Sequence, residues 1–375
     1  MESVVVGPPH RAATRRHPSK VLEEDVHTIV RALEPTLRPL KGSTVLVTGG
    51  VGFVCSYFIE TIACLNDHAW EQSCQVLCVD NLATGVRHRL AHLRDRTDIR
   101  FIHHDISLPL SLRERVAWII HGAGIASPMT YRRYPLETIE VNVGGTRQVL
   151  ELAKAHRVRS VLYLSSSEIY GDPPDEWIPT PEHYRGNVSC TGPRACYDES
   201  KRLAETLCGI AHQFFRVPVK VVRPFNLYGP GQRLDDGRII PDLMSAAVHR
   251  KPLVLYSDGR ATRAFCYIRD AIQAMWQAFL SDREGDIFNV GNDQEEIRIE
   301  DLAERVRQIA GPPWLTIEQH RSPDPHYVTD NPQRRCPDLT KLRSYFPWEP
   351  TVTLAEGLQR TVTSCRELAG RTRSG

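Results

Sequence analysis

The sequence lacks the features that mark several classes of protein. It has no run of apolar residues long enough to span a membrane, and no apolar segment near its N-terminus typical of a signal peptide. Neither charge is in excess, because 47 basic residues stand against 45 acidic residues, which argues against a nucleic-acid or membrane surface along the whole chain. Its 10 cysteines include no C-x-x-C pair, which indicates reduced thiols rather than disulfides or a zinc site. These absences favour a cytoplasmic protein without a metal centre.

The 375 residues are enough for one large or two medium domains with a sizeable apolar core. Residues 1–20 are rich in Pro, Arg and His and lack periodicity, which predicts a disordered tail. Residues 21–33 carry apolar side chains at helical spacing and predict one helix before the main domain. We therefore expect an N-terminal extension over residues 1–40, partly disordered and containing this helix.

From Ser43 onward, short apolar segments alternate with helical patterns, which predicts an α/β fold with a Rossmann-like, doubly wound parallel sheet. After Arg223 the pattern loosens and Gly and Pro become frequent. We expect a main domain over residues 41–223 and a smaller substrate-binding lobe over 224–375, from which some segments can return to the sheet. The expected strands are 44–47, 75–79, 99–102, 116–120, 160–164 and 217–222, and the expected helices include 136–155 and one that begins near residue 197.

Two segments carry the strongest chemical signal. Ser166 and Glu168 follow the apolar strand 160–164, so they lie at the carboxyl end of a buried strand. Tyr197 and Lys201 are four residues apart and share one face of a helix. The lysine charge favours the phenolate form, so Tyr197 is expected to work as a base near neutral pH. Alone, a Tyr-x-x-x-Lys pair is more often part of an ordinary helix surface. Together with the strand-end serines and a nucleotide-binding motif upstream, the pair is more often catalytic.

That motif is Gly50-x-Gly52-x-x-Cys55, which follows a strand and opens a helix. The glycines permit a tight turn, and the helix N-terminus offers N–H donors to a diphosphate. The third position normally holds Gly or Ala, and with Cys55 we expect a slight displacement of the helix, not loss of binding. Asp80, at the end of the second strand, is expected to accept hydrogen bonds from ribose hydroxyls, which favours NAD over NADP.

Together these segments resemble the extended short-chain dehydrogenase/reductase family, and most closely its UDP-glucuronate decarboxylases, over about residues 43–363. The resemblance implies a resident NAD, the nucleotide sugar UDP-glucuronate as substrate, and a homodimer built from the helices 136–155 and 197–212. In the implied reaction, oxidation at C4 of the sugar turns the C5 carboxylate into a β-keto acid, which loses carbon dioxide before the hydride returns to C4. The segments that carry the resemblance are 166–173, 186–188, 192–202, 235–238 and 262–267.

The resemblance also implies three sets of site residues. Arg335 is expected to meet the sugar carboxylate, although the family often has lysine where this chain has Cys336. The catalytic set is Ser166, Glu168, Tyr197, Lys201 and Arg335. The cofactor set is Gly49, Gly52, Phe53, Val54, Asp80, Asn81, Asp105, Ile106, Ala123, Tyr197 and Lys201. The substrate set is Ser127, Glu168, Tyr197, Asn226, Arg233, Tyr256, Arg263 and Arg335.

One position distinguishes a decarboxylase from related nucleotide-sugar 4,6-dehydratases. Nucleotide-sugar 4,6-dehydratases have an aspartic acid between the strand-end hydroxyl and the glutamate, where it protonates the departing C6 hydroxyl. Here the residue is Ser167, and a decarboxylase has no hydroxide to expel. Two alternatives stay open: a 4-epimerase or 4,6-dehydratase on the same scaffold, and a non-catalytic regulatory protein that binds NAD, for which Cys55 is the support.

Overall fold

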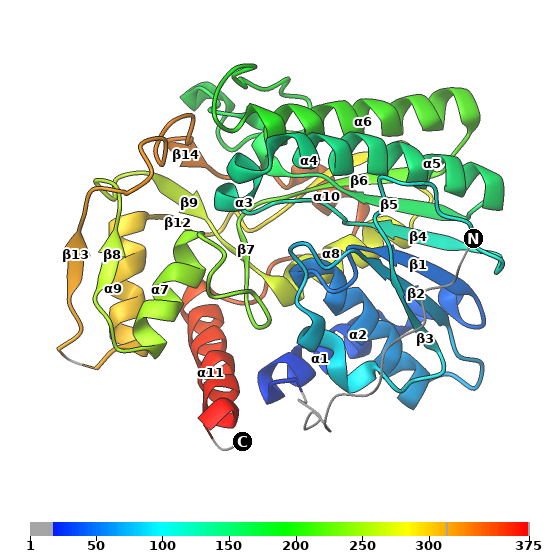
Figure 1. The fold of residues 1–375 in the computed structure, drawn as a ribbon, viewed down its shortest axis with the longest axis horizontal. Coiled ribbons are helices and arrows are strands. Elements are labelled where there is room, and N and C mark those ends of the chain that lie inside the picture. The colour runs from blue at the N-terminus through cyan, green and yellow to red at the C-terminus, as the bar shows by residue number, and fades with distance from the viewer. Residues whose placement is uncertain (1–17, 313, 374–375) are drawn as a thin grey trace, which may run out of the picture.

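The computed structural model describes residues 18–312 and 314–373. At its centre lies a parallel sheet in the order β11-β6-β5-β4-β1-β2-β3 (Figure 1). The inner strands are largely buried, as in β5, where every residue is buried, because helices cover both faces of the sheet. The edge strand β3 differs, since Arg100, Phe101 and His103 are exposed. Their bounds are β1 (Thr44–Thr48), β2 (Gln75–Asp80), β3 (Ile99–His103), β4 (Trp118–His121), β5 (Ser160–Leu164), β6 (Val219–Pro224) and β11 (Ile287–Val290).

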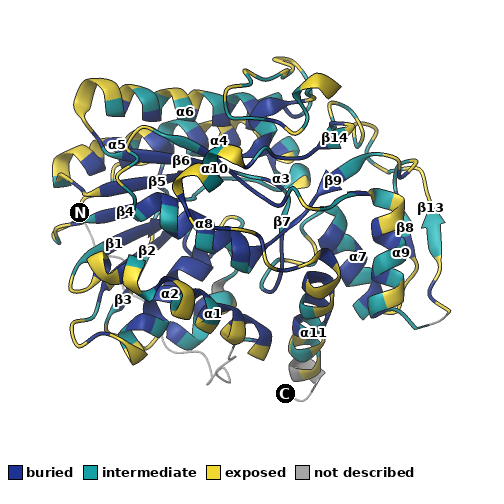
Figure 2. Ribbon diagram, turned by 180° about the vertical axis from the view of Figure 1, so that it is seen from behind, coloured by how far each residue is buried: buried dark blue, intermediate teal, exposed yellow. Residues whose placement is uncertain are grey.

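Two apolar cores separate the sheet from its covering helices (Figures 1 and 2). One face packs against α1 (Lys20–Leu37), α2 (Phe53–His68) and α8 (Ile268–Leu280). The opposite face packs against α5 (Gly145–His156) and α6 (Ala195–Phe215), with α4 (Pro135–Ile139) alongside α6. The chain runs outward from β1 to β3 and then crosses to β4 on the other side of β1. This reversal leaves a crevice beyond the carboxyl ends of β1 and β4, where ligands of doubly wound sheets bind.

The strands expected before residue 223 are all present, with ends shifted by one or two residues. Strand β11 lies far beyond that point in the chain and pairs with β6, so the sequence after residue 224 contributes to the sheet. The expected helix 136–155 is interrupted by a π-helical segment, Glu140–Gly144, between α4 and α5. Of the predicted tail, residues 1–17 lie outside the described residues, while Lys20 already begins α1.

A smaller lobe stands beside the sheet (Figure 1). Its own core is lined by side chains of α7, α9 and α11, and β9 joins β12 and β14 in a three-stranded sheet. The lobe's elements are α7 (Ile239–Val248), β8 (Leu253–Leu255), β9 (Thr262–Ala264), β12 (Glu296–Arg298), α9 (Ile299–Ala310), β13 (Ile317–Gln319), β14 (Arg334–Arg335) and α11 (Leu354–Arg373). Shorter elements between sheet and lobe are α3 (Pro128–Arg133), β7 (Leu227–Tyr228), β10 (Cys266–Tyr267) and α10 (Thr340–Tyr345).

The added helix α1 is held by a buried carboxylate as well as by apolar packing. Asp25 is fully buried and accepts hydrogen bonds from the Tyr267 hydroxyl at 2.6 Å and from the Arg360 guanidinium at 2.9 Å. Burial raises the pKa of Asp25 to about 6, against the opposing effect of these partners. Helix α1 is thereby tied to α11 at the other end of the chain. None of the helices in the described part of the chain combines the length and apolar character needed to cross a bilayer.

Candidate active site

A cleft of about 1610 Å³ opens beyond the carboxyl ends of the strands and extends under the lobe. The turns after β1, β4, β5 and β6 each contribute lining residues, namely Gly49, Gly122, Ser166 and Asn226. The lobe contributes Tyr256, Arg263 and Arg335 from the other side. The cleft is therefore placed by the sheet's topology and closed by the lobe.

Tyr197 and Lys201 lie in the first turns of α6, and each is 5% exposed. Lys201 Nζ donates a hydrogen bond to the Leu164 carbonyl at the end of β5, at 2.8 Å. The Tyr197 ring stacks on Tyr131, with centroids 5.1 Å apart and planes 10° apart. A hydrogen bond with the Ser166 side chain completes the surroundings of the phenol. The strand-end hydroxyl, the phenol and the ammonium thus come together, as the sequence predicted.

Burial has the largest effect on the pKa values of Tyr197 and Lys201. Burial raises the pKa of Tyr197 to about 12, although the Ser166 hydrogen bond and the charge of Arg238 lower it. Burial also lowers the pKa of Lys201 to about 8. Desolvation is the largest effect on both groups in the chain without ligands. That Tyr197 works as a base near neutral pH, activated by Lys201 and the nicotinamide charge, stays a prediction.

Glu168 sits in the short 3-10 segment Ser167–Tyr170 and is held by two guanidinium groups. Arg335 forms a bidentate pair with it, at 2.7 Å for Nη2 to Oε2, and Arg194 donates to the same Oε2. These two cations hold the pKa of Glu168 well below its ordinary value, despite burial. The nearby Asp198 responds in the opposite way, because burial and the charge of Glu168 raise its pKa.

Positive charge exceeds negative charge around Glu168. Arg263 is 7% exposed, and its pKa falls to about 9 because of burial and the charges of Arg335 and Arg194. The Arg263 guanidinium donates hydrogen bonds to the Asn331 side chain at 3.0 Å and to the Pro332 carbonyl at 2.7 Å. Arg194 and Arg335 therefore pair with the ionised Glu168, and Arg194 also lies 3.8 Å from Asp198. Arg263 adds a third buried guanidinium group to this part of the cleft.

The turn after β1 fits a dinucleotide diphosphate. Gly49 has φ +67°, and a Cβ there would lie 2.8 Å from the Ala123 backbone nitrogen. A Cβ on Gly52 would lie 2.9 Å from the Gly49 carbonyl oxygen, so neither position accepts a side chain. Phe53 and Val54 then begin α2 and line the cleft.

Cys55 is accommodated by a glycine across the crevice. Its side chain is 2% exposed, and its thiol approaches the Thr48 carbonyl at 3.6 Å. A Cβ on Gly122 would lie 2.3 Å from the sulfur, so the thiol occupies space that any larger residue at 122 would need. Helix α2 keeps its N-terminus directed at the cleft.

The other predicted cofactor residues line the ends of β2 and β3 and the turn after β4. The Asp80 carboxylate accepts hydrogen bonds from the Val51 amide at 3.1 Å and the Leu82 amide at 2.8 Å. Asn81 donates to Asp105 at 3.0 Å, and Ile106 is buried under Gly145. Unlike the glycine turn, these residues do not line the main cleft, so they would meet only the adenosine half of a dinucleotide. The donor and acceptor set fits NAD.

The predicted substrate residues all line the cleft, but several are already engaged. Asn226 donates to the Ala264 carbonyl at 3.0 Å, and Ser127 to the Asp236 carbonyl at 2.9 Å. Arg233 is exposed and forms a bidentate pair with Asp235, at 2.8 and 2.7 Å. Tyr256 packs edge-on against Tyr327, with centroids 5.6 Å apart.

Sequence reasoning missed three residues of the site. Arg194 lies three positions before Tyr197 in the same motif, so helical spacing could have indicated it. Tyr131 stacks on Tyr197, and its buried hydroxyl has no hydrogen-bond partner in the described residues. Asn142, in the π-helical segment, donates to Ser200 at 2.9 Å, and its buried Oδ1 likewise lacks a partner within the described chain. Such unpaired atoms beside the cleft are ready to meet a ligand.

A glycine turn that opens a helix, an acidic residue ending the next strand and a buried Tyr-Lys pair define a dinucleotide-dependent dehydrogenase-type enzyme. The chain belongs to the NAD dependent epimerase/dehydratase family, whose model matches residues 45–291. NAD is accordingly its cofactor.

Two proteins named UDP-glucuronic acid decarboxylase are similar to this chain over most of its length. UDP-glucuronic acid decarboxylase 1 of Arabidopsis thaliana is 38% identical over 322 residues, which cover 86% of this chain and 69% of the relative. UDP-glucuronic acid decarboxylase 1 of Xenopus tropicalis is 35% identical over 351 residues, covering 91% and 78%. The resemblance inferred from the motifs is therefore confirmed over most of this chain.

Solved structures confirm the fold. The epimerase Mth375 from Methanothermobacter thermautotrophicus superposes with a TM-score of 0.78 at 23% identity, covering 92% of this chain and 98% of that chain. The dTDP-glucose 4,6-dehydratase DesIV from Streptomyces venezuelae, as a double mutant solved with NAD bound, gives 0.75 at 24% identity, covering 87% and 98%. The Rossmann-like sheet with a smaller lobe is common to all three.

The ion pairs of Glu168 with Arg194 and Arg335 predict a contribution to the free energy of unfolding that depends on pH. Because the folded pKa of Glu168 lies below the ordinary 4.5, the stabilisation is fully present above pH 4.5 and is lost as pH falls toward the folded pKa. We expect Glu168→Gln to lower the free energy of unfolding by about 3–5 kcal/mol at neutral pH. Below pH 4.5 this difference should shrink by up to about 1.4 kcal/mol per pH unit.

Urea denaturation of both proteins across this pH range provides the measurement. Asp175→Asn is the matched control, since that carboxylate also pairs with an arginine, Arg334 at 3.2 Å, but is 85% exposed. It should change the free energy of unfolding by less than about 1 kcal/mol. A difference between wild type and Glu168→Gln that stays constant down to acid pH would contradict the assignment of a paired, ionised Glu168.

Proposed function

We propose that this chain decarboxylates UDP-glucuronate to UDP-xylose through a UDP-4-keto intermediate, with NAD restored in every turnover. The similarity to UDP-glucuronic acid decarboxylases over most of the chain supports the substrate and the reaction. The observation that carries the proposal within this structure is the surplus of buried guanidinium groups, from Arg194, Arg263 and Arg335, beside Tyr197. A buried site with excess positive charge suits a substrate that brings its own carboxylate.

The first step assigns roles to the residues around the phenol. Tyr197 accepts the proton of the sugar's C4 hydroxyl, and Ser166 holds the same oxygen by a hydrogen bond. When bound, NAD supplies a reversible hydride acceptor for C4, and its positively charged ring adds to the field that favours the phenolate. Lys201, anchored on the Leu164 carbonyl, keeps its charge close to the phenol.

The second step moves charge from the carboxylate to the C4 oxygen. In the 4-keto sugar the C5–C6 bond breaks, carbon dioxide leaves, and the electron pair forms an enolate whose charge rests on the C4 oxygen. Ser166 and the protonated Tyr197 donate hydrogen bonds to that oxygen and stabilise the charge as it develops. A proton from solvent adds at C5, and Tyr197 returns its proton to the C4 oxygen as the hydride comes back. Arg335 with Glu168 orients the carboxylate before the bond breaks.

Ser167 supports decarboxylation over dehydration. It lies between Ser166 and Glu168, is buried, and lines the cleft at the position where a dehydratase needs an acid. A hydroxyl group with an ordinary pKa cannot protonate a departing hydroxide comparably. Glu168 itself cannot replace that acid, because its two guanidinium partners keep it ionised.

Mass spectrometry of purified protein with UDP-glucuronate tests the proposal. We expect loss of carbon dioxide and formation of a UDP-pentose. If part of the purified protein lacks NAD, adding NAD should increase the rate of this reaction. Turnover of UDP-glucose or dTDP-glucose without decarboxylation would replace the proposal with an epimerase or dehydratase. Binding of NAD without any product would identify a regulatory protein.

The matched variant is Tyr197→Phe, which removes only the phenolic oxygen. General acid–base catalysis contributes about 10²–10⁴-fold, so the decarboxylation rate should fall by about that factor while NAD binding persists. An unchanged rate would exclude Tyr197 as the base.

We also propose that two copies of the chain pair through α4, the π-helical segment, α5 and α6. These helices form one outer face of the molecule, on which Figure 2 shows many exposed positions. Several of the exposed side chains are apolar. Leu203, predicted as exposed, is 48% exposed and Ile210 is 42% exposed, whereas Leu207 is half-buried in its own subunit. On α4, Leu136 is 76% exposed. Burying such a stripe in a four-helix bundle removes it from water.

The double substitution Leu203→Glu with Ile210→Glu should convert the dimer to a monomer, because four buried carboxylates would oppose association. Light scattering after size-exclusion chromatography measures the mass. Leu108→Glu, at a position 57% exposed outside these helices, should leave it unchanged. A wild-type protein that runs as a monomer at micromolar concentration would contradict the proposed dimer.

The proposed compartment is the cytoplasm. All 10 cysteines are free in the structure, and one of them, Cys190, is exposed. A reducing compartment keeps such thiols unpaired. Fractionation of source cells would overturn this assignment if the protein were recovered from an oxidising compartment.

A further inference from the structure

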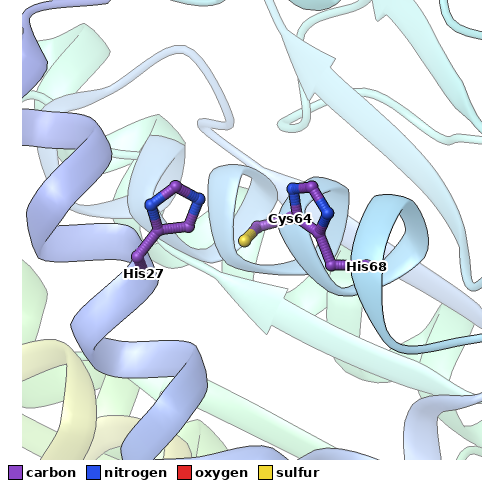
Figure 3. Close-up of side chains that lie close together, drawn as sticks. All are labelled: His27, Cys64 and His68. Carbon is purple, nitrogen blue, oxygen red and sulfur yellow. The ribbon is translucent and has the colours of Figure 1, made fainter.

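Away from the cleft, three side chains with metal-binding atoms converge where α1 lies against α2. Figure 3 shows His27 from α1 beside Cys64 and His68 from α2. One ligand atom from each residue lies within 4.8 Å of the other two. Both imidazoles are exposed, while the thiol is half-buried between the helices.

The local structure explains this convergence. Cys64 and His68 are four residues apart on one helix, so their side chains share a face. His27 is brought to them by the packing of α1, and the His27 and His68 ring centroids lie 6.0 Å apart at an interplanar angle of 63°. Two imidazoles on one tetrahedral zinc ion have centroids about 5 Å apart, given a Zn–N distance of about 2.0–2.1 Å. Small side-chain rotations therefore suffice to close the site.

These three side chains are free to bind a ligand. Apart from the contact between the two rings, none of them forms a hydrogen bond or ion pair within the described chain. The neighbouring carboxylates are already paired with other side chains: Glu60, one turn before Cys64, pairs with His92 at 3.0 Å, and Asp67 pairs with Arg96 at 2.7 Å.

The thiol binds a metal ion as a thiolate. When the ion binds, a metal–sulfur bond forms and the thiol proton leaves to solvent, so the charge on the sulfur is compensated as it appears.

We propose that His27, Cys64 and His68 bind one zinc ion, with water as the fourth ligand, and that the ion joins α1 to α2. Two imidazole nitrogens and a thiolate suit Zn²⁺, whereas Mg²⁺ and Ca²⁺ prefer oxygen ligands. This proposal departs from the sequence-based expectation of a chain without a metal centre. It is independent of the proposed decarboxylation, because it lies outside the cleft and uses a helix that precedes the family match at residues 45–291.

Cobalt titration of the full chain, after treatment with a chelator, tests the site directly. We expect one Co²⁺ per chain, with absorption bands of tetrahedral cobalt and a thiolate charge-transfer band, both removed by added Zn²⁺ but not by Mg²⁺. Cys64→Ser should abolish the charge-transfer band. His27→Gln and His68→Gln should each weaken binding by at least about tenfold. Cys190→Ser, at an exposed cysteine outside the cluster, is the matched control and should bind as the wild type does.

Thermal unfolding supplies a second readout that does not depend on spectroscopy. Zinc at about 100 times its dissociation constant should raise the Tm of the wild type by about 3 °C, and should leave the Tm of His27→Gln unchanged. Because His27 is exposed, this variant tests the metal without disturbing a core. Failure of the wild type to bind zinc at micromolar concentration would overturn the proposal. So would binding that survives unchanged in Cys64→Ser and His27→Gln, since the ion would then lie elsewhere.

Discussion

The ion pairs of the Glu168 carboxylate join three distant parts of the chain. Glu168 follows β5, Arg194 precedes α6, and Arg335 belongs to β14 in the lobe. A buried carboxylate with only one partner would be costly, so the lobe, the central strand and the start of α6 must be placed together for the charge to be compensated. The position of Tyr197, one turn into α6, follows from this arrangement. The cleft is thus assembled around a charge that the protein cannot leave unpaired.

Burial gives the site its dependence on a cofactor. Desolvation raises the pKa of Tyr197 and lowers that of Lys201, so both groups resist their charged forms in the chain alone. In the proposed reaction, the positive charge of bound NAD would supply the stabilisation that the phenolate lacks. The same buried surroundings would strengthen the hydrogen bonds made to the C4 oxygen as charge develops there.

Local patterns in the sequence predicted much of this molecule. The strands before residue 223, the glycine turn and the Tyr197–Lys201 face follow from short-range periodicity, and the resemblance indicated Glu168 and Arg335. Strand β11 was not predicted, because three apolar residues around Asn289 carry no signal of the strand with which they will pair. Nor was the pairing of Glu168 with Arg335, which are 167 positions apart, or the approach of His27 to Cys64. Such contacts depend on how helices pack, which composition does not encode.

The meeting of α1 with α11 has a consequence for synthesis. Ser19 and Ser364 share a hydrogen bond at 2.7 Å, and Arg360 reaches Asp25 near the start of the chain. A ribosome delivers α1 before α11, so Asp25 is made 335 positions ahead of the Arg360 guanidinium that pairs with it. The buried carboxylate of α1 therefore gains this partner only after α11 has been synthesised.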